Sequence, residues 1–292
     1  IGNDGTNRVN DPHTFTVTVM RQVGAGGPEA VSGVTVTPTG DTGFLTGTGT
    51  CETGTTDASG QCTIIVNSSS PGQASIGATA DVPIDGSSIS VSTDEDATTP
   101  SSAPATKTWV DAKISISPLT DLNPVGVEHT FTVTVEKDLG DGNGWVAAAG
   151  EAVTATQGGS LATVTLGGTC TTGNTDASGQ CTFTYNSAAA GTLILTANST
   201  LNIDGVSIPL STDGTGNNSG PATKTWGRAW ITIAADGTNE VNDAHTFTVT
   251  VMREVGTAGP AAVSGVTVTP TGDTEFLTGT GTCETGTTDA SG

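Results

Sequence analysis

Basic residues are scarce in this chain of 292 residues: eight Lys and Arg stand against 29 Asp and Glu, which gives a net charge of −21. A nucleic-acid-binding surface needs a cluster of cations to meet the phosphates, and eight cations over this length cannot form one. The same shortage disfavours binding to an anionic membrane surface. No apolar run approaches the roughly 20 residues of a membrane-spanning helix, so we expect no membrane insertion within this segment.

Aromatic residues are also few, at 4%, and charged residues make up only 13% of the chain. The charged fraction is about half of the usual value, so the polar surface must be mostly uncharged, and threonine supplies it. The hydrophobic fraction of 34% still allows a packed core, so the acidity does not indicate disorder. The low aromatic content argues against a carbohydrate-binding surface, where exposed aromatic side chains are expected.

Internal repeats dominate the sequence. The string His-Thr-Phe-Thr-Val-Thr-Val begins at His13, His129 and His245, with a spacing of 116 residues each time. Ala-Thr-Lys-Thr-Trp ends a unit at Trp109 and again at Trp226. Such a period indicates an array of similar structural units.

The repeat has a second level, because residues 1–60 match residues 233–292 at all but nine positions, whereas the middle unit is more divergent. The order is therefore A-B-A. We expect two domains and the first half of a third, at residues 1–110, 111–228 and 229–292.

Apolar residues alternate with threonine throughout each unit. In the segment 14–19, Phe15, Val17 and Val19 share one face and threonines occupy the other. This period of two, rich in β-branched residues and interrupted by Gly, Pro, Asn and Asp, is typical of half-buried strands. Seven or eight short strands in about 116 residues, without a helix-length amphipathic stretch, predict an all-β chain of antiparallel β-sandwiches joined by short linkers.

The turn Thr-Asp-Ala-Ser-Gly occurs at 56–60, 175–179 and 288–292, and after the second copy come the strand 180–187 and the Ala-Gly-Thr-Leu-Ile-Leu-Thr-Ala run at 190–197. This order resembles the bacterial immunoglobulin-like domains of the invasin/intimin type, over essentially every unit. The resemblance implies immunoglobulin-like sandwiches in a linear array and a role as a rod-building module of bacterial surface proteins. A cysteine just after the turn departs from the usual pattern.

The five cysteines occupy two positions of the repeat. Cys51 and Cys62 are 11 residues apart, and so are Cys170 and Cys181. Because Cys62 alternates with buried-type residues and the chain folds back through the intervening turn, we expect one disulfide in each unit; two buried free thiols are the alternative. The spacing does not resemble a zinc site. Disulfides imply an oxidising, extracellular location, and the partner of Cys283 is expected beyond Gly292.

The three histidines, His13, His129 and His245, are one repeat position and precede the same strand. No nucleophile motif accompanies them, and a catalytic residue copied into every unit of a rod would be unusual. We therefore expect a structural role for the histidines and no enzymatic activity.

A lysine precedes the repeated tryptophan by two residues and shares its face of the strand, so a buried tryptophan directs the lysine inward too. An asparagine recurs near the start of each unit. A buried lysine and asparagine beside a carboxylate can form an isopeptide crosslink, whereas the alternative is a lysine that extends its ammonium to water. The candidate residues for a crosslink are Lys107, Lys224, Asn7, Asn123 and Asn239.

Calcium is a weaker possibility, and otherwise no cofactor is expected. The stretch from Asp138 through Asp141 to Asn143 has the composition of a calcium loop, and Asp111 lies just after a domain-closing tryptophan. The spacing is not that of an EF-hand, and the next junction has Arg228 in place of an acid. The alternative is that these acidic loops are simply solvated.

The sequence favours a structural function. We expect a segment of a long fibre or adhesin stalk on the bacterial cell surface, whose partners are neighbouring domains of the same array and possibly other copies of the chain. One alternative is that the repeats themselves bind a receptor or polysaccharide. A second alternative is a stalk that carries a distant enzyme domain.

Overall fold

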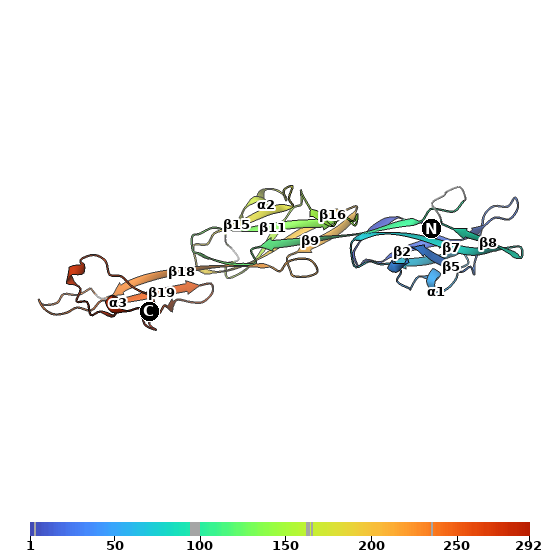
Figure 1. Ribbon diagram of the computed structural model, residues 1–292. Helices are drawn as coiled ribbons and strands as arrows, with labels where there is room; N and C mark the ends of the chain where they lie inside the picture. Colours follow the sequence, from blue (N-terminus) through green and yellow to red (C-terminus); the bar gives the residue numbers. More distant parts are fainter. Residues whose placement is uncertain (3, 94–99, 162–163, 165, 235) are drawn as a thin grey trace.

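The computed structural model describes residues 1–2, 4–93, 100–161, 164, 166–234 and 236–292. Three all-β units follow one another along an extended chain, with the two ends of the chain at opposite ends of the molecule (Figure 1). The prediction of tandem antiparallel sandwiches is confirmed for the first two units, each of which has two sheets around its own core.

In the first unit, one sheet contains β1, β5, β7, β8 and the first part of β9, and β2 pairs with β6 in the opposing layer. The elements are β1 (Gly5–Arg8), β2 (His13–Thr18), β3 (Met20–Arg21), β4 (Glu29–Ala30), β5 (Val36–Gly40), the 3₁₀ turn η1 (Thr42–Phe44), α1 (Thr50–Thr53), β6 (Gln61–Val66), β7 (Gly72–Ile84), β8 (Ser87–Ser92) and β9 (Ala105–Ser117).

The second unit repeats this plan. One sheet contains the second part of β9 with β11, β12, β14 and β15, and the other contains β10, β13, β16, β17 and the first part of β18. The elements are β10 (Thr120–Pro124), β11 (His129–Asp138), β12 (Trp145–Ala147), β13 (Thr154–Gly159), β14 (Leu166–Gly167), α2 (Thr169–Thr172), β15 (Gln180–Tyr185), β16 (Gly191–Ile203), β17 (Val206–Ser211) and β18 (Ala222–Ala234).

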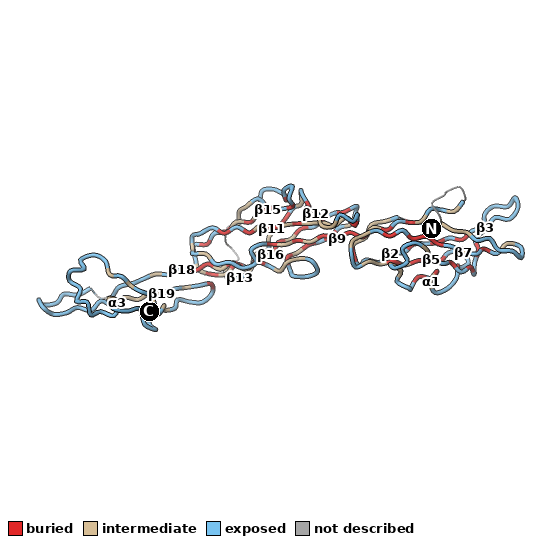
Figure 2. The backbone as a smooth tube through the Cα atoms, viewed as in Figure 1, coloured by how far each residue is buried: buried red, intermediate tan, exposed pale blue. Residues whose placement is uncertain are grey.

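Each complete unit has a separate hydrophobic core. In the first, Phe15 and Ile64 from one layer meet Ile76 and Trp109 from the other, and the second unit packs Phe131, with its neighbours, against Trp226 in the same way. Figure 2 shows the buried residues gathered inside the first two units. The alternation of apolar residues and threonine therefore places one apolar face of each strand between the layers, as the sequence predicts.

No linker separates consecutive units, which differs from the short linkers expected from the sequence. Along β9, residues 105–110 pair with strands of the first unit and residues 111–117 pair with β11 of the second. β18 crosses the next junction in the same way, from β16 and β10 to β19. A single strand of 13 residues thus belongs to two domains at each junction.

The third unit contains counterparts of residues 1–60 only, and its elements are β19 (Thr248–Val255), β20 (Ala261–Ala262), the 3₁₀ turn η2 (Thr274–Phe276) and α3 (Thr282–Thr285). Residues 237–240, which correspond to β1, form no strand here. In the first unit this segment pairs with β9 near Trp109, and the third unit has no counterpart of that strand. Apolar side chains at the core positions, such as Phe247, are consequently exposed.

The only α-helical segments among the described residues are the single turns α1, α2 and α3, of four residues each, which the sequence analysis did not anticipate. In that same part of the chain, no helix has the length and apolar character needed to span a membrane.

Candidate functional site

The two predicted disulfides are present. Cys51 is bonded to Cys62 and Cys170 to Cys181, with a Cα–Cα distance of 5.0 Å in each pair. All four cysteines are buried in the cores. Cys283, at the equivalent position of the third unit, is unpaired.

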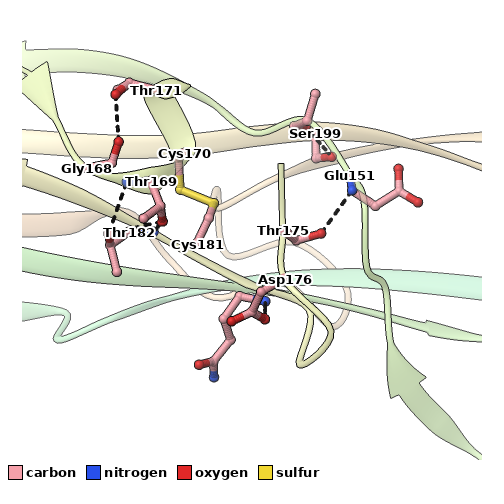
Figure 3. Close-up of a disulfide and its surroundings, with 12 residues drawn as sticks. Glu151, Gly168, Thr169, Cys170, Thr171, Thr175, Asp176, Cys181, Thr182 and Ser199 are labelled. Atoms are coloured by element: carbon pink, nitrogen blue, oxygen red, sulfur yellow. Dashed lines mark hydrogen bonds between the residues drawn. A yellow bond between two sulfur atoms is a disulfide. The ribbon is translucent and has the colours of Figure 1, made fainter. Parts of the chain in front are cut away.

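Each disulfide attaches a one-turn helix to a strand, and a pair of threonines beside it makes the same connection by hydrogen bonds. In the second unit, the Thr182 amide donates to Thr169 Oγ1 at 2.8 Å, and the Thr169 amide donates to Thr182 Oγ1 at 3.2 Å (Figure 3). The first unit has the same reciprocal bonds between Thr50 and Thr63. The sequence analysis missed these threonines, although one precedes the first cysteine and one follows the second in both units.

Three residues of the Thr-Asp-Ala-Ser-Gly turn, namely Thr56, Asp57 and Gly60, have a structural role. Thr56 is buried, and its hydroxyl donates to the Val31 carbonyl and accepts from the Val34 amide. The Asp57 carboxylate accepts the amides of Ser59 and Gln61, which closes the turn. Gly60 has φ of +70°, and a Cβ at this position would lie 2.6 Å from the Val19 carbonyl oxygen. The turn therefore needs glycine there.

The histidines pack in the structural manner expected. Each imidazole lies edge-on against the phenylalanine two residues later, with ring centroids 4.5–4.7 Å apart. His129 is buried, its Nδ1 lies 3.0 Å from Asp121 Oδ2, and its Nε2 has no hydrogen-bond partner. Burial, followed by repulsion from Lys224, lowers the pKa of His129, so the ring is neutral at neutral pH.

Both repeated lysines are fully buried, at 0% exposure, so neither extends its ammonium to water. Lys224 contacts Asp121 Oδ2 at 2.6 Å, on the strand beside its own. The hydrogen bond from Lys224 is the main cause of a lowered pKa at Asp121. Lys224, Asp121 and His129 thus form one polar cluster in the second unit, and the repeat comparison alone did not single out Asp121.

The first unit lacks this carboxylate, because Gly5 occupies the position equivalent to Asp121. Lys107 Nζ instead donates to the amide oxygen of Asn7 at 2.6 Å. No ion pair of Lys107 is found in the described part of the chain, and burial lowers the pKa of this lysine to about 8. The same lysine position is therefore ion-paired in one unit and buried against a neutral amide in the other.

The recurring asparagines are explained by the turn that follows the first strand of each unit. The side-chain amide of Asn7 donates to the carbonyls of Asp11 and Pro12, Asn123 donates to the Glu128 carbonyl, and Asn239 makes equivalent bonds. In the second unit the lysine is paired with Asp121 rather than with the asparagine. The isopeptide crosslink therefore stays an untested possibility, and contact between its two groups is described only for Lys107 and Asn7.

We expect the intact mass of the chain to equal the sequence mass less four hydrogens for the two disulfides. The Lys107–Asn7 contact is a hydrogen bond to the amide oxygen, and no hydrogen bond or ion pair described for either side chain brings a carboxylate that could assist expulsion of ammonia. Intact-mass spectrometry decides the question, because each crosslink would remove one ammonia. The variant Asn7→Ser, which cannot form the bond, is the control.

Two of the weak calcium candidates, Asp111 and Asp138, are register partners on β9 and β11. Asp138 accepts the Gly140 amide, and both carboxylate oxygens of Asp141 accept hydrogen bonds from Asn143. The hydrogen bonds from Asn143 lower the pKa of Asp141. Among the described residues, no group of three or more His, Cys, Asp or Glu side chains could hold a metal ion.

Asp111 lies at the junction between the first two units. It is buried, its Oδ2 accepts a hydrogen bond from Asn217 at 3.2 Å, and Arg8 Nε approaches its Oδ1 at 3.9 Å. Arg8 belongs to the first unit and Asn217 to the second, so Asp111 connects the two domains. At the next junction, Arg228 pairs with Glu254 at 2.8 Å.

No protein-family model and no curated protein matches the chain. Among solved structures, it is similar to the D0-D1 domain of intimin, with 19% identity, 76% of this chain and 95% of that chain covered, and a TM-score of 0.24. It is also similar to a C-terminal 282-residue fragment of intimin, solved in complex with the intimin-binding domain of the translocated intimin receptor. The identity is 16%, 79% of this chain is covered, and the TM-score is 0.33. The match spans 64% of the length of that fragment.

A third similar structure comprises domains 4 and 5 of the S-layer protein SbsC, with 17% identity, 53% of this chain and 69% of that chain covered, and a TM-score of 0.21. At these identities a likeness concerns the fold, and the fold assignment stands on the chain's own strand pairing and cores. The first two units are antiparallel β-sandwiches in tandem, and the solved structures similar to the chain include intimin domains, of the type that its sequence resembles.

Proposed function

We propose that this chain is a structural segment of an extracellular bacterial surface fibre or adhesin stalk, in which the sandwiches act as stiff spacers without catalytic activity. The observation that carries the proposal is the continuity of β9 and β18 across the two junctions. A flexible linker lets domains reorient freely, whereas a strand paired on both sides of a junction must lose ladder hydrogen bonds before the domains can bend.

Contacts beside the strand support the same proposal. At the first junction the buried Asp111 joins Arg8 to Asn217, and at the second Arg228 pairs with Glu254. The disulfide within each complete unit is suited to an oxidising location outside the cell. A weakly charged, threonine-rich surface with a net charge of −21 discourages lateral sticking of such a rod.

The alternative in which the repeats bind a receptor or polysaccharide has less support. A groove on the first unit, between β5 and the β7–β8 hairpin, is lined by threonine, serine and small apolar residues and by Asp81, and no aromatic side chain is among its lining residues. A stalk that carries a distant enzyme would use the same stiff spacers, so that alternative shares the mechanical role proposed here.

Interrupting β9 is expected to make the first junction flexible. An insertion of four Gly-Ser residues between Val110 and Asp111 separates the half of β9 that pairs with first-unit strands from the half that pairs with β11. Small-angle scattering of the whole chain should then show a smaller radius of gyration and a broader distribution of distances than the unmodified chain.

The control carries the same four residues after Gly26, in the exposed turn between β3 and β4, two short strands that pair with each other within the first unit. That variant should scatter like the unmodified chain. An unmodified chain that already shows a broad distribution of distances would contradict the stiff-spacer function.

A further inference from the structure

In each complete unit, a strand near the start of the unit lies parallel to the strand through which the chain leaves it. β1 pairs with β9 from Gly5–Lys107 to Arg8–Val110, and β10 pairs with β18 in the same way. In the first unit the chain runs from the start of β1 to the first part of β9; in the second unit the second part of β9, paired with β11, precedes β10, and the chain leaves through β18. In both units the earlier of the two parallel strands is therefore loaded from its start and the later one from its end. Tension along the chain therefore pulls the two strands in opposite directions and strains their ladder hydrogen bonds together, in shear.

The buried lysine lies on this parallel ladder. Lys224 is the direct register partner of Asp121, and its ammonium bonds to the Asp121 carboxylate at 2.6 Å. In the first unit the register partner of Lys107 is Gly5, which has no side chain to pair with it. The two units thus differ at the point where tension separates their terminal strands.

We propose, on the basis of the proposed stalk function, that the Asp121–Lys224 ion pair makes the second unit the mechanically stronger one and that units with glycine at this position extend first under tension. The third unit has Gly237 there and so repeats the pattern of the first. The A-B-A order then sets an alternation of weaker and stronger domains along the array, so that the A-type domains extend before the B-type domains do.

The physical reason is the strength of the cross-strand contact. The Asp121 carboxylate adds the attraction of a full negative charge to its hydrogen bond from the Lys224 ammonium, whereas the Asn7 amide offers the Lys107 ammonium only a dipole. Asp121 also approaches His129, on the next strand of its own unit, so sliding β10 past β18 breaks two polar contacts there. In the first unit sliding exposes an ammonium whose burial is not offset by a carboxylate, so extension is favoured.

Single-molecule extension of the whole chain tests the proposal. A 20-residue Gly-Ser insertion after Gly142 identifies the second unit, because it adds about 70 Å to the length that this unit releases. Exposed turns tolerate such insertions, and this one is distant in sequence from β10 and β18. We expect the longer release to occur at the higher force.

Two substitutions should reverse the order in which the units extend, one by weakening the second unit and the other by strengthening the first. Asp121→Asn keeps the shape of the side chain but removes its charge, and should speed unfolding of the second unit about tenfold at a given force. Gly5→Asp should slow the first unit by a similar factor, since a Cβ at Gly5 meets only the flexible end of Lys107 at 3.3 Å and the His13 ring at 3.5 Å. Gly5→Asn, which adds a side chain without charge, is the matched control and should have little effect.

The proposal is overturned if the shorter release occurs at the higher force, if the two releases occur at the same force, or if Asp121→Asn leaves the second unit unchanged. If Gly5→Asp impairs folding, the Asp121→Asn result alone is sufficient to test the proposal. Bending at the junctions, measured by scattering, tests the stiff-spacer function separately, so a failure of either idea can be recognised without the other.

Discussion

Removing the Cys51–Cys62 bridge is expected to lower the free energy of unfolding of the first unit by about 3 kcal/mol. The bridge joins residues 11 apart in sequence, and closing a loop of this size restricts the unfolded chain by that amount in the loop-entropy account. Such a loss is large beside the roughly 5–15 kcal/mol of a typical domain. The threonine pair at Thr50 and Thr63 keeps its hydrogen bonds, so the helical turn should remain attached to β6 while the unit loses stability.

Chemical denaturation of the whole chain with Cys51→Ala and Cys62→Ala measures this loss. The same double change at Cys170 and Cys181 should destabilise the second unit by a similar amount, because the loops have equal length. Cys283→Ser is the control, since that cysteine makes no bridge, and should leave both units unchanged. Peptide mapping that joins Cys51 to a cysteine of another unit would contradict the local pairing.

The sequence predicts the sandwiches and their bridges because both depend on local patterns. A period of two in apolar residues places Phe15 and Val17 on one face, and both are buried. Cys62 alternates with Ile64 in the same way, and the turn between the cysteines brings Cys51 back to it. Such information is contained within about twenty neighbouring residues, and an internal repeat supplies it more than once.

The continuous strands at the junctions could not be predicted in this way. Residues 105–117 have a strand pattern throughout, but the pattern does not tell which partners the two halves of β9 take. Those partners include β7 and β11, which lie far apart in the chain and belong to different domains. Pairing over such distances is decided by tertiary packing, and composition near Val110 gives no indication of it.

The polar cluster of the second unit was missed for a related reason. The alignment of repeats emphasises residues that recur, such as the lysines and asparagines, whereas Asp121 matters because it replaces a glycine. Its contact with Lys224 follows from the parallel register of β10 and β18. The signal for Asp121 is a position that differs between the repeats and that is the register partner of a buried lysine.

Replacing Lys107 by methionine is expected to stabilise the first unit at neutral pH by on the order of 3 kcal/mol. Burial lowers the pKa of Lys107 to about 8 from a usual value of 10.5, and each pKa unit corresponds to about 1.4 kcal/mol. Methionine has a similar shape without the charge, so the core stays filled. Part of the gain is offset because the Asn7 amide oxygen loses its hydrogen bond from the lysine.

The pH dependence provides the stricter test, and its sign follows from proton binding. Between pH 8 and 10.5 the unfolded chain holds a proton on Lys107 that the folded unit has released, so the unfolding free energy of the original unit rises with pH in this window. Lys107→Met should remove that rise, so the two proteins converge at high pH and differ most below pH 8. Lys224→Met is the control: it breaks the ion pair with Asp121, so it should bring no comparable gain at neutral pH. A constant difference between Lys107→Met and the original chain from pH 7 to 10.5 would show that the buried ammonium is not what destabilises the first unit.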